Sequence, residues 1–224
     1  MEEYISSNGK KCLILNKIDS KELAYTIGFI CADGNIDSLN RVDIALSIKD
    51  KEILNFIGDT IGSNVHTSNI YIKAQRRFPK CRTSRKIKDI LKFIGNRKKE
   101  YRNLPIVKHD LIRYLVLGFF DGDGCITWGR RKDRNRIWQN VSFTSSFSLL
   151  EPVQKILESI GISSSIKPKG TDKCFVLKIS SKTDVLKFCD WLYGDGEFVI
   201  LKRKFDVFRA LRLELGEFGE TIKK

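Results

Sequence analysis

Two aspartates that each end an apolar stretch are the residues of this chain whose type and setting could do chemistry. Thr26–Gly34 reads TIGFICADG and Val116–Gly124 reads VLGFFDGDG, so each segment passes through a glycine to a terminal Asp-Gly. Asp33 and Asp123 lie 90 residues apart, too far for one local calcium-binding loop. Two carboxylates brought together from two halves of a chain would bind a divalent cation. The pattern therefore predicts a metal site where two similar halves meet.

Two helices must position these aspartates. A helix-capping residue precedes each apolar stretch, and the glycine after each aspartate suits the left-handed stop at a helix C-terminus. Each helix carries two small residues four positions apart, and such a small face lets two helix backbones approach closely. The small residues are Gly28, Ala32, Gly118 and Gly122. We expect the helices to pack along them and to bring the two carboxylates side by side.

The chemistry of this helix end favours a hard cation. The helix dipoles already place negative charge there, so the two carboxylates are repelled both by each other and by the helix ends. A bound divalent cation reverses both effects. Oxygen ligands suit magnesium or calcium rather than zinc, because the only histidines, His66 and His109, adjoin neither motif. One Asp-Gly could simply be a turn that closes a helix, but two copies in the same setting favour the metal site.

The similarity of the two halves extends beyond the motifs. Lys51–Gly62 and Leu150–Gly161 both read as helices that end in Ile-Gly, and Ile87–Phe93 matches Lys182–Phe188. With strand pairs between these helices, each half reads α-β-β-α-β-β-α, an α+β fold with one antiparallel sheet per half. The predicted parts are a first domain at 1–95 with an N-terminal extension at 1–19, a linker at 96–109 and a second domain at 110–224.

The charge of the chain indicates its partner. The 224 residues carry a net charge of +14, and such a surface typically binds a polyanion or an anionic membrane. No apolar run approaches the roughly 20 residues of a membrane span, and the acidic start Met1-Glu2-Glu3 is unlike a secretory signal. A membrane-surface protein would need a basic amphipathic helix with an exposed apolar face. We therefore expect an intracellular protein that binds no membrane.

Basic residues gather in two segments. One runs from Tyr71 to Arg102, with thirteen Lys and Arg against two acids, and the other is the hairpin tip Arg130–Arg136. A two-stranded ribbon fits the major groove, where Arg can read base edges, although much of the run must contact phosphate. The first hairpin, Asn35–Ser47, is short and the second is long and basic, so we expect an asymmetric target. The candidate DNA contacts are Lys73, Arg76, Arg77, Lys80, Arg82, Arg85, Arg130, Arg131, Lys132, Arg134 and Arg136.

The two aspartate segments resemble the paired LAGLIDADG motifs of the homing endonucleases, in the form in which one chain carries both motifs. The repeated elements extend this resemblance over about residues 20–210. The resemblance implies that the motif helices form the domain interface and that each sheet lies in the DNA major groove. It also implies that Asp33 and Asp123 bind divalent metal, and we expect the backbone carbonyls of Ala32 and Gly122 to help.

One position departs from the family pattern. The second motif carries both Asp121 and Asp123, whereas the first has Cys31 where the family often has Asp. That position is usually structural rather than catalytic in the family. The difference therefore concerns the stability of the helix end, while the terminal carboxylate is kept.

The resemblance further implies one lysine near the metal in each half, to stabilise charge on the scissile phosphate or to tune the attacking water. Lys98, within Arg97-Lys98-Lys99, fits this role in the first half. Lys202, within Leu201-Lys202-Arg203-Lys204, fits it in the second. The neighbouring lysines could serve instead, and a basic run could equally be a surface that contacts solvent or phosphate.

The function that this resemblance implies is DNA cleavage. We expect a monomeric, magnesium-dependent endonuclease that hydrolyses one phosphodiester in each strand of a long duplex site, with calcium supporting binding but not cleavage. Two alternatives are an intron RNA maturase and a DNA-binding regulator whose motifs have lost the acids. Retention of both carboxylates disfavours the regulator. The maturase stays open, because bifunctional relatives keep both acids.

Overall fold

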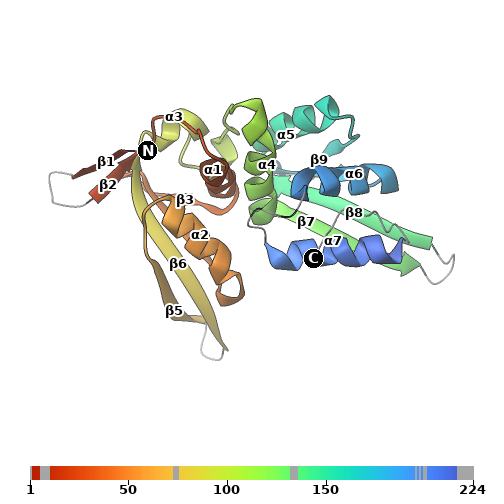
Figure 1. Ribbon diagram of the computed structural model, residues 1–224, viewed down its shortest axis with the longest axis horizontal. Helices are drawn as coiled ribbons and strands as arrows, with labels where there is room; N and C mark the ends of the chain where they lie inside the picture. The colour runs from red at the N-terminus through yellow and green to blue at the C-terminus, as the bar shows by residue number, and fades with distance from the viewer. Residues whose placement is uncertain are drawn as a thin grey trace.

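Two similar halves flank a central pair of helices, α1 (Lys21–Asp33) and α4 (His109–Asp123), which lie side by side (Figure 1). The computed structural model describes residues 2–5, 11–72, 76–131, 136–194, 196, 198 and 201–215. Each half places its sheet and its remaining helices on its own side of this pair. The predicted α+β fold with two pseudo-symmetric halves is confirmed.

The first half follows the predicted α-β-β-α-β-β-α order. Its strands form one sheet in which β6 pairs antiparallel with β4 along one edge and with β5 along the other. Two strands from the predicted N-terminal extension join this sheet, because β2 lies parallel to the end of β6. The elements are β1 (Glu2–Ile5), β2 (Lys11–Ile14), α1, β3 (Asn35–Ile36), β4 (Arg41–Ser47), the 3-10 turn η1 (Ile48–Asp50), α2 (Lys51–Thr60), β5 (Val65–Ile72), β6 (Arg76–Lys88) and α3 (Ile90–Ile94).

The second half repeats this order and adds a helix. Its sheet runs β7-β8-β10-β9, the same order as β3-β4-β6-β5 in the first half. The short 3-10 turn η2 (Lys99–Tyr101) lies in the predicted linker. The elements are α4, β7 (Gly124–Arg131), β8 (Arg136–Ser145), α5 (Phe147–Ser159), β9 (Ser165–Lys169), β10 (Thr171–Ile179), α6 (Lys182–Tyr193) and the additional helix α7 (Lys202–Glu214).

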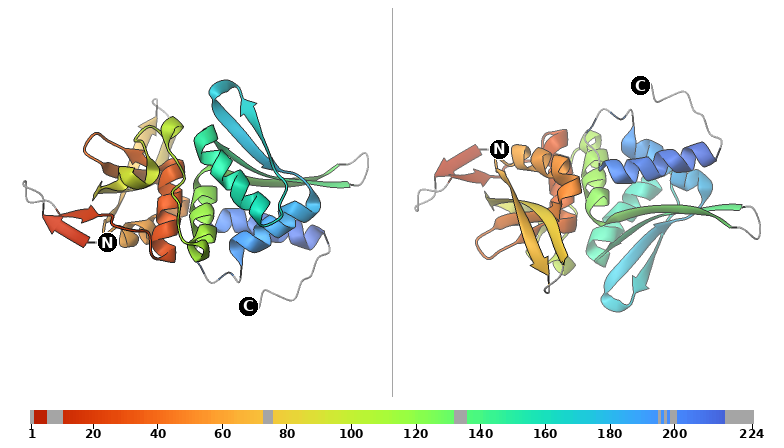
Figure 2. Two further views of the ribbon diagram at one scale, coloured as in Figure 1. Left: turned by 90° about the horizontal axis from the view of Figure 1, so that it is seen from above. Right: turned by 90° about the horizontal axis from the view of Figure 1, so that it is seen from below.

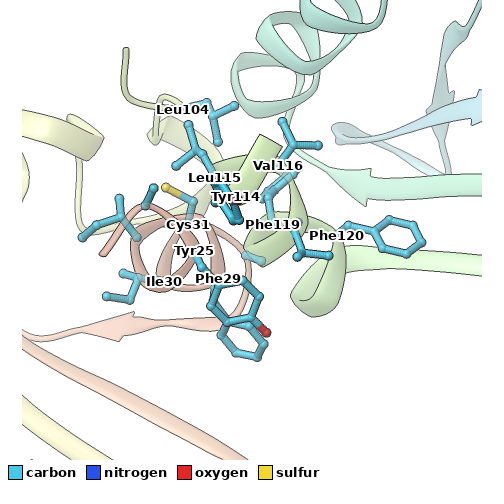
Figure 3. Packing of buried hydrophobic residues seen from close by; sticks show 14 of the residues in the cluster. Tyr25, Phe29, Ile30, Cys31, Leu104, Tyr114, Leu115, Val116, Phe119 and Phe120 are labelled. Atoms are coloured by element: carbon cyan, nitrogen blue, oxygen red, sulfur yellow. The ribbon is translucent and has the colours of Figure 1, made fainter. Parts of the chain in front are cut away.

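The central helices pack along their small residues. A Cβ atom at Gly28 would overlap the carbonyl oxygen of Leu115, and a Cβ atom at Gly118 would overlap the carbonyl oxygen of Tyr25. Tyr25 and Leu115 lie 90 residues apart, at equivalent positions of the two repeats, so these contacts obey a pseudo-two-fold axis. Apolar side chains from both helices fill the space around this seam (Figure 3). The close approach of the two backbones fixes the ends of both helices relative to each other.

Strand alternation gives each sheet one buried face. In β4, Val42 and Ile44 are buried while Arg41 is exposed, as expected for a sheet covered by helices on one side only. On α2, Ile53 and Ile57 lie on the face that packs into the core, because a spacing of four residues keeps them on one side of a helix. The opposite face of each sheet is therefore left open. None of the described helices combines the length and apolar character needed to cross a membrane.

Candidate metal centre and nucleic-acid interface

The two motif aspartates are the last residues of α1 and α4. The glycine after each aspartate has extended backbone, with φ of −71° at Gly34 and −83° at Gly124, so the predicted left-handed stop is wrong. Glycine is needed there for space. A Cβ atom at Gly34 would lie 2.7 Å from the carbonyl oxygen of Ile30, and one at Gly124 would overlap the Phe120 ring.

The two helix ends lie against each other. A Cβ atom at Gly122 would overlap the Cβ atom of Ala32 and would lie 3.6 Å from the backbone nitrogen of Asp33. The Asp33 side chain is exposed, whereas that of Asp123 is only 10% exposed. Burial raises the pKa of Asp123, and the charge of Asp33 adds to this effect. The structure therefore brings together all four of these residues, the two aspartates and the two whose carbonyls were predicted to assist them.

A lysine from the linker contacts the buried aspartate. Lys99 Nζ lies 2.7 Å from Asp123 Oδ1, and its charge opposes the effect of burial on the pKa of Asp123. The other carboxylate oxygen, Oδ2, is buried and makes no well-formed hydrogen bond, although the Ser145 hydroxyl is near enough to lower that pKa. One oxygen of Asp123 is thus held by an ammonium group, and the other is available to a further cation.

Lys98 and Asp33 both line a cleft next to this site. The cleft has a volume of about 440 Å³ and opens at the C-terminus of α1. Lys98 is exposed, and its backbone N–H donates to Asn96 Oδ1. The lining residues are Ala32, Asp33, Gly34, Asn35, Ile36, Arg97, Lys98, Lys99, Glu100 and Arg102.

A buried cation lies beneath each motif-helix end. Arg102 Nη1 donates to the carbonyl oxygens of Ile30 at 2.9 Å and Cys31 at 3.3 Å. Lys204 Nζ donates to the equivalent carbonyls of α4, those of Phe120 at 2.5 Å and Asp121 at 2.8 Å. Each cation therefore neutralises the negative end of one helix dipole. Lys202, the predicted lysine of this half, is exposed at the first position of α7.

Burial lowers the pKa of both of these cations. Arg102 is 2% exposed and Lys204 is 6% exposed. Burial lowers the pKa of Arg102 and lowers that of Lys204 to about 8. Sequence reasoning missed Arg102, which lies in the predicted linker, and it named Lys204 only as a neighbour of Lys202. A basic residue two to four positions after the first lysine of each run was the available signal, and only the folded chain selects it.

The first aspartate of the second motif, Asp121, forms a hydrogen bond across the interface between the two halves. Asp121 Oδ2 accepts hydrogen bonds from Tyr25 Oη at 2.9 Å and from the Leu201 backbone N–H at 3.0 Å. Burial raises the pKa of Asp121 to about 6. Cys31 occupies the equivalent place in α1, fully buried, and burial raises the pKa of its thiol to about 12. Asp121 thus points into the seam between the halves rather than toward the open cleft.

Strand alternation divides the predicted DNA contacts between two faces. In β7, Ile126 is buried, so Arg130, four residues on, lies on the helix-covered face, where it pairs with Glu214 at the end of α7. Arg131 lies on the open face. In β6, Arg85 shares the helix-covered face with buried Ile87 and pairs with Glu3 at 2.9 Å.

The open face of the first sheet carries Arg82, which is paired with Asp43 on β4. Of the predicted contacts whose side chains are described, Arg82 and Arg131 therefore face outward, whereas Arg85 and Arg130 do not. Lys73, Lys132 and Arg134 lie outside the described residues. Arg76, Arg77, Lys80 and Arg136 belong to described strands, but their side chains lie outside the described part of the chain.

The sequence of the second half matches a known family. Residues 110–192, from α4 to the end of α6, match the model of a family described as "LAGLIDADG-like domain". No curated protein matches the chain. The predicted resemblance is thus confirmed by sequence for residues 110–192.

Solved structures with the same fold cover both halves of this protein. The homing endonuclease I-LtrWI, bound to target DNA, has a TM-score of 0.60 at 14% identity over 88% of this chain and 91% of its own. I-GzeII, in complex with its DNA target, has a TM-score of 0.57 at 13% identity, over 86% and 91%. The meganuclease I-AabMI, bound to uncleaved DNA, has a TM-score of 0.56 at 14% identity over the same shares. The chain therefore has the two-domain LAGLIDADG fold.

Proposed function

We propose that this LAGLIDADG-like protein is a homing-type endonuclease that cuts both strands of a long, asymmetric DNA site, acting as an intracellular monomer. The observation that supports it most is the carboxylate pair, Asp33 and Asp123, at the seam between two sheets that each leave one face open. The net charge of +14 favours a polyanionic partner. Structures of this fold are described as bound to target DNA, and one, of I-SmaMI, as bound in the presence of calcium ions.

The residues present fit a divalent metal ion. Two carboxylates meet at two negative helix ends, and Asp123 keeps one buried oxygen without a well-formed hydrogen bond. The described residues contain no group of three or more His, Cys, Asp or Glu side chains that could hold a metal. Asp33 and Asp123, with the carbonyls of Ala32 and Gly122, would therefore leave room for phosphate and water oxygens, as magnesium prefers. When bound, the ion supplies Lewis-acid stabilisation of the charge on the phosphate.

The protein's own cations would complete the site. Lys99 holds one oxygen of Asp123 and is 39% exposed, so its ammonium group can also reach a phosphate in the cleft. Lys204 donates hydrogen bonds to the last carbonyls of α4. It therefore positions the helix end and does not contact DNA. We therefore add Lys99 and Lys204 to the predicted Lys98 and Lys202 as lysines that support the chemistry at the two aspartates.

The deciding experiment is cleavage of a randomised duplex library. With magnesium, we expect selection of one long, asymmetric site cut once in each strand. Calcium in place of magnesium should support specific binding without cutting, because calcium holds oxygen ligands loosely and activates water poorly. Cleavage that persists in EDTA would contradict the metal site. Specific binding of intron RNA without cleavage of any duplex would favour the maturase.

Two adjacent lysines offer a matched comparison. We expect Lys99→Met to slow cleavage about 100-fold or more at saturating DNA, because it removes a cation from the carboxylate and from the reacting phosphate. Lys98→Met should slow it less than tenfold, since Lys98 only lines the cleft. Single-turnover cleavage rates measure both effects. A larger loss for Lys98 than for Lys99 would assign the catalytic role to Lys98.

The two faces of the sheets should differ in their contribution to DNA binding. We expect Arg82→Ala and Arg131→Ala each to weaken binding and to lower the slope of log K against log salt, by up to about 0.9 for each phosphate that the variant no longer neutralises. Arg85→Ala and Arg130→Ala should leave that slope unchanged, because these side chains lie on the helix-covered face. Binding titrations at several salt concentrations test this. Equal changes in all four variants would show that the strand faces are wrongly assigned.

A further inference from the structure

One large apolar side chain lies on the open face of the second sheet. Trp138 on β8 is 44% exposed, and its cross-strand partner on β7 is Gly129. It shares the open face with Arg131 and Asn140, because residues two apart along a strand, and their cross-strand partners, point the same way. Trp128, close by in sequence, lies on the helix-covered face and packs against the core. The two tryptophans of this hairpin therefore have different surroundings.

Gly129 leaves space for the exposed indole ring of Trp138, because it has no side chain. A Cβ atom at Gly129 would lie 2.9 Å from Trp138 Nε1 and 3.0 Å from Cε2 and Cζ2. The ring therefore lies across the backbone of β7, where a residue with a side chain would displace it. Because one side of the ring is supported in this way, its orientation is set before any partner binds. A fixed apolar group is costly to expose to water and gains by being covered.

We propose that Trp138 reads a thymine by packing against its C5-methyl group in the major groove, an inference that rests on the proposed function. In the major groove only thymine among the four unmodified bases presents a methyl group, and apolar side chains recognise it by contact. The polar neighbours on this face, Arg131 and Asn140, suit phosphates and base edges. Trp138 is the apolar element between them and adds a preference that a cation cannot supply.

The place of Trp138 in the hairpin sets where the thymine should lie. Ser142 on β8 pairs with Cys125, which lies two residues after Asp123. Trp138 lies four residues from Ser142, toward the tip of the hairpin. At about 3.4 Å per residue, this is roughly 14 Å outward from the Ser142–Cys125 pair, or up to about four base pairs along the groove. The β7–β8 hairpin projects away from the central helices (Figure 2), while β3 in the first half has only two residues. The thymine should therefore occur in one half-site only.

Replacement of thymine by deoxyuridine tests the contact by removing one methyl group. Each thymine of the selected duplex is replaced in turn, and binding is measured in calcium. For the wild type, we expect one position in the outer part of one half-site to bind about three- to tenfold more weakly with uracil. For Trp138→Ala, the thymine duplex should bind more weakly by the same factor, and uracil at that position should have no further effect.

Two further variants separate this contact from a general loss of binding. Gly129→Ala should displace the indole and lower the sensitivity to uracil at the same position, whereas Trp128→Phe should leave it intact. Thermal melting shows whether each variant is folded. A wild type that binds no duplex specifically would contradict the proposed function. Three outcomes would overturn the thymine contact alone. The wild type could bind specifically with no uracil-sensitive position. The Trp138→Ala variant could stay uracil-sensitive, or it could bind every sequence more weakly by the same factor.

Discussion

Asp33→Asn and Asp123→Asn should each reduce DNA cleavage in magnesium by about 1000-fold or more, while leaving specific binding in calcium within about threefold of wild type. Asparagine keeps the size of the side chain but removes the negative charge that holds the cation, and the loss of one group that stabilises a transition state commonly costs 100-fold to 1000-fold. Binding should survive because the contacts to DNA come from the open sheet faces. Plasmid cleavage rates and binding titrations of the same preparations measure the two quantities.

The matched control is Asp59→Asn, which removes an exposed carboxylate of α2 outside the site and should cut at the wild-type rate. Asp123→Asn also leaves Lys99 without its partner carboxylate, so its melting temperature must be compared with that of Asp33→Asn. Asp33 is exposed and offers the cleaner test. Wild-type cleavage by either motif variant would show that the carboxylate pair is not the catalytic centre.

Gly28→Val should lower the free energy of unfolding by about 3 to 5 kcal/mol, a large part of the roughly 5 to 15 kcal/mol that is usual for a folded protein. The side chain would have to occupy the space of the Leu115 carbonyl oxygen, so the two motif helices would separate and lose the packing of the seam. Gly118→Val should have the same effect through the Tyr25 carbonyl oxygen, as the pseudo-two-fold axis requires. Urea unfolding followed by circular dichroism measures the loss.

Gly170→Ala is the control for a glycine replaced away from the seam. Its φ is +77° and nothing lies within 4 Å of the added Cβ atom, so we expect only about 1 kcal/mol from backbone strain. If Gly28→Val fails to fold, Gly28→Ala serves as the milder variant and should still lose more than Gly170→Ala. Equal losses at Gly28 and Gly170 would mean that the close contact of the helices is not needed for stability.

Local signals in the chain were enough to predict the repeated architecture and the pairing of its central helices. Apolar periodicity, the matched Ile-Gly helices and the small residues at Gly28 and Gly118 are such signals, because helix faces follow from a spacing of four residues. The division of the basic residues between two faces was also within reach. Arg82 and Arg85 are three residues apart on one strand, so they cannot share a face.

The groups that surround the carboxylates, in contrast, depend on the tertiary structure. Lys99 rather than Lys98 contacts Asp123, and Arg102 reaches the end of α1 from the linker, because the path of an irregular segment and a short 3-10 turn sets the direction of each side chain. No pattern in a basic run encodes that direction. The same reason applies to Lys204, whose burial under α4 depends on how α7 packs against the second half. Sequence periodicity fixes which face of a regular element a residue occupies, whereas the contacts of residues between such elements depend on the packing of the whole chain.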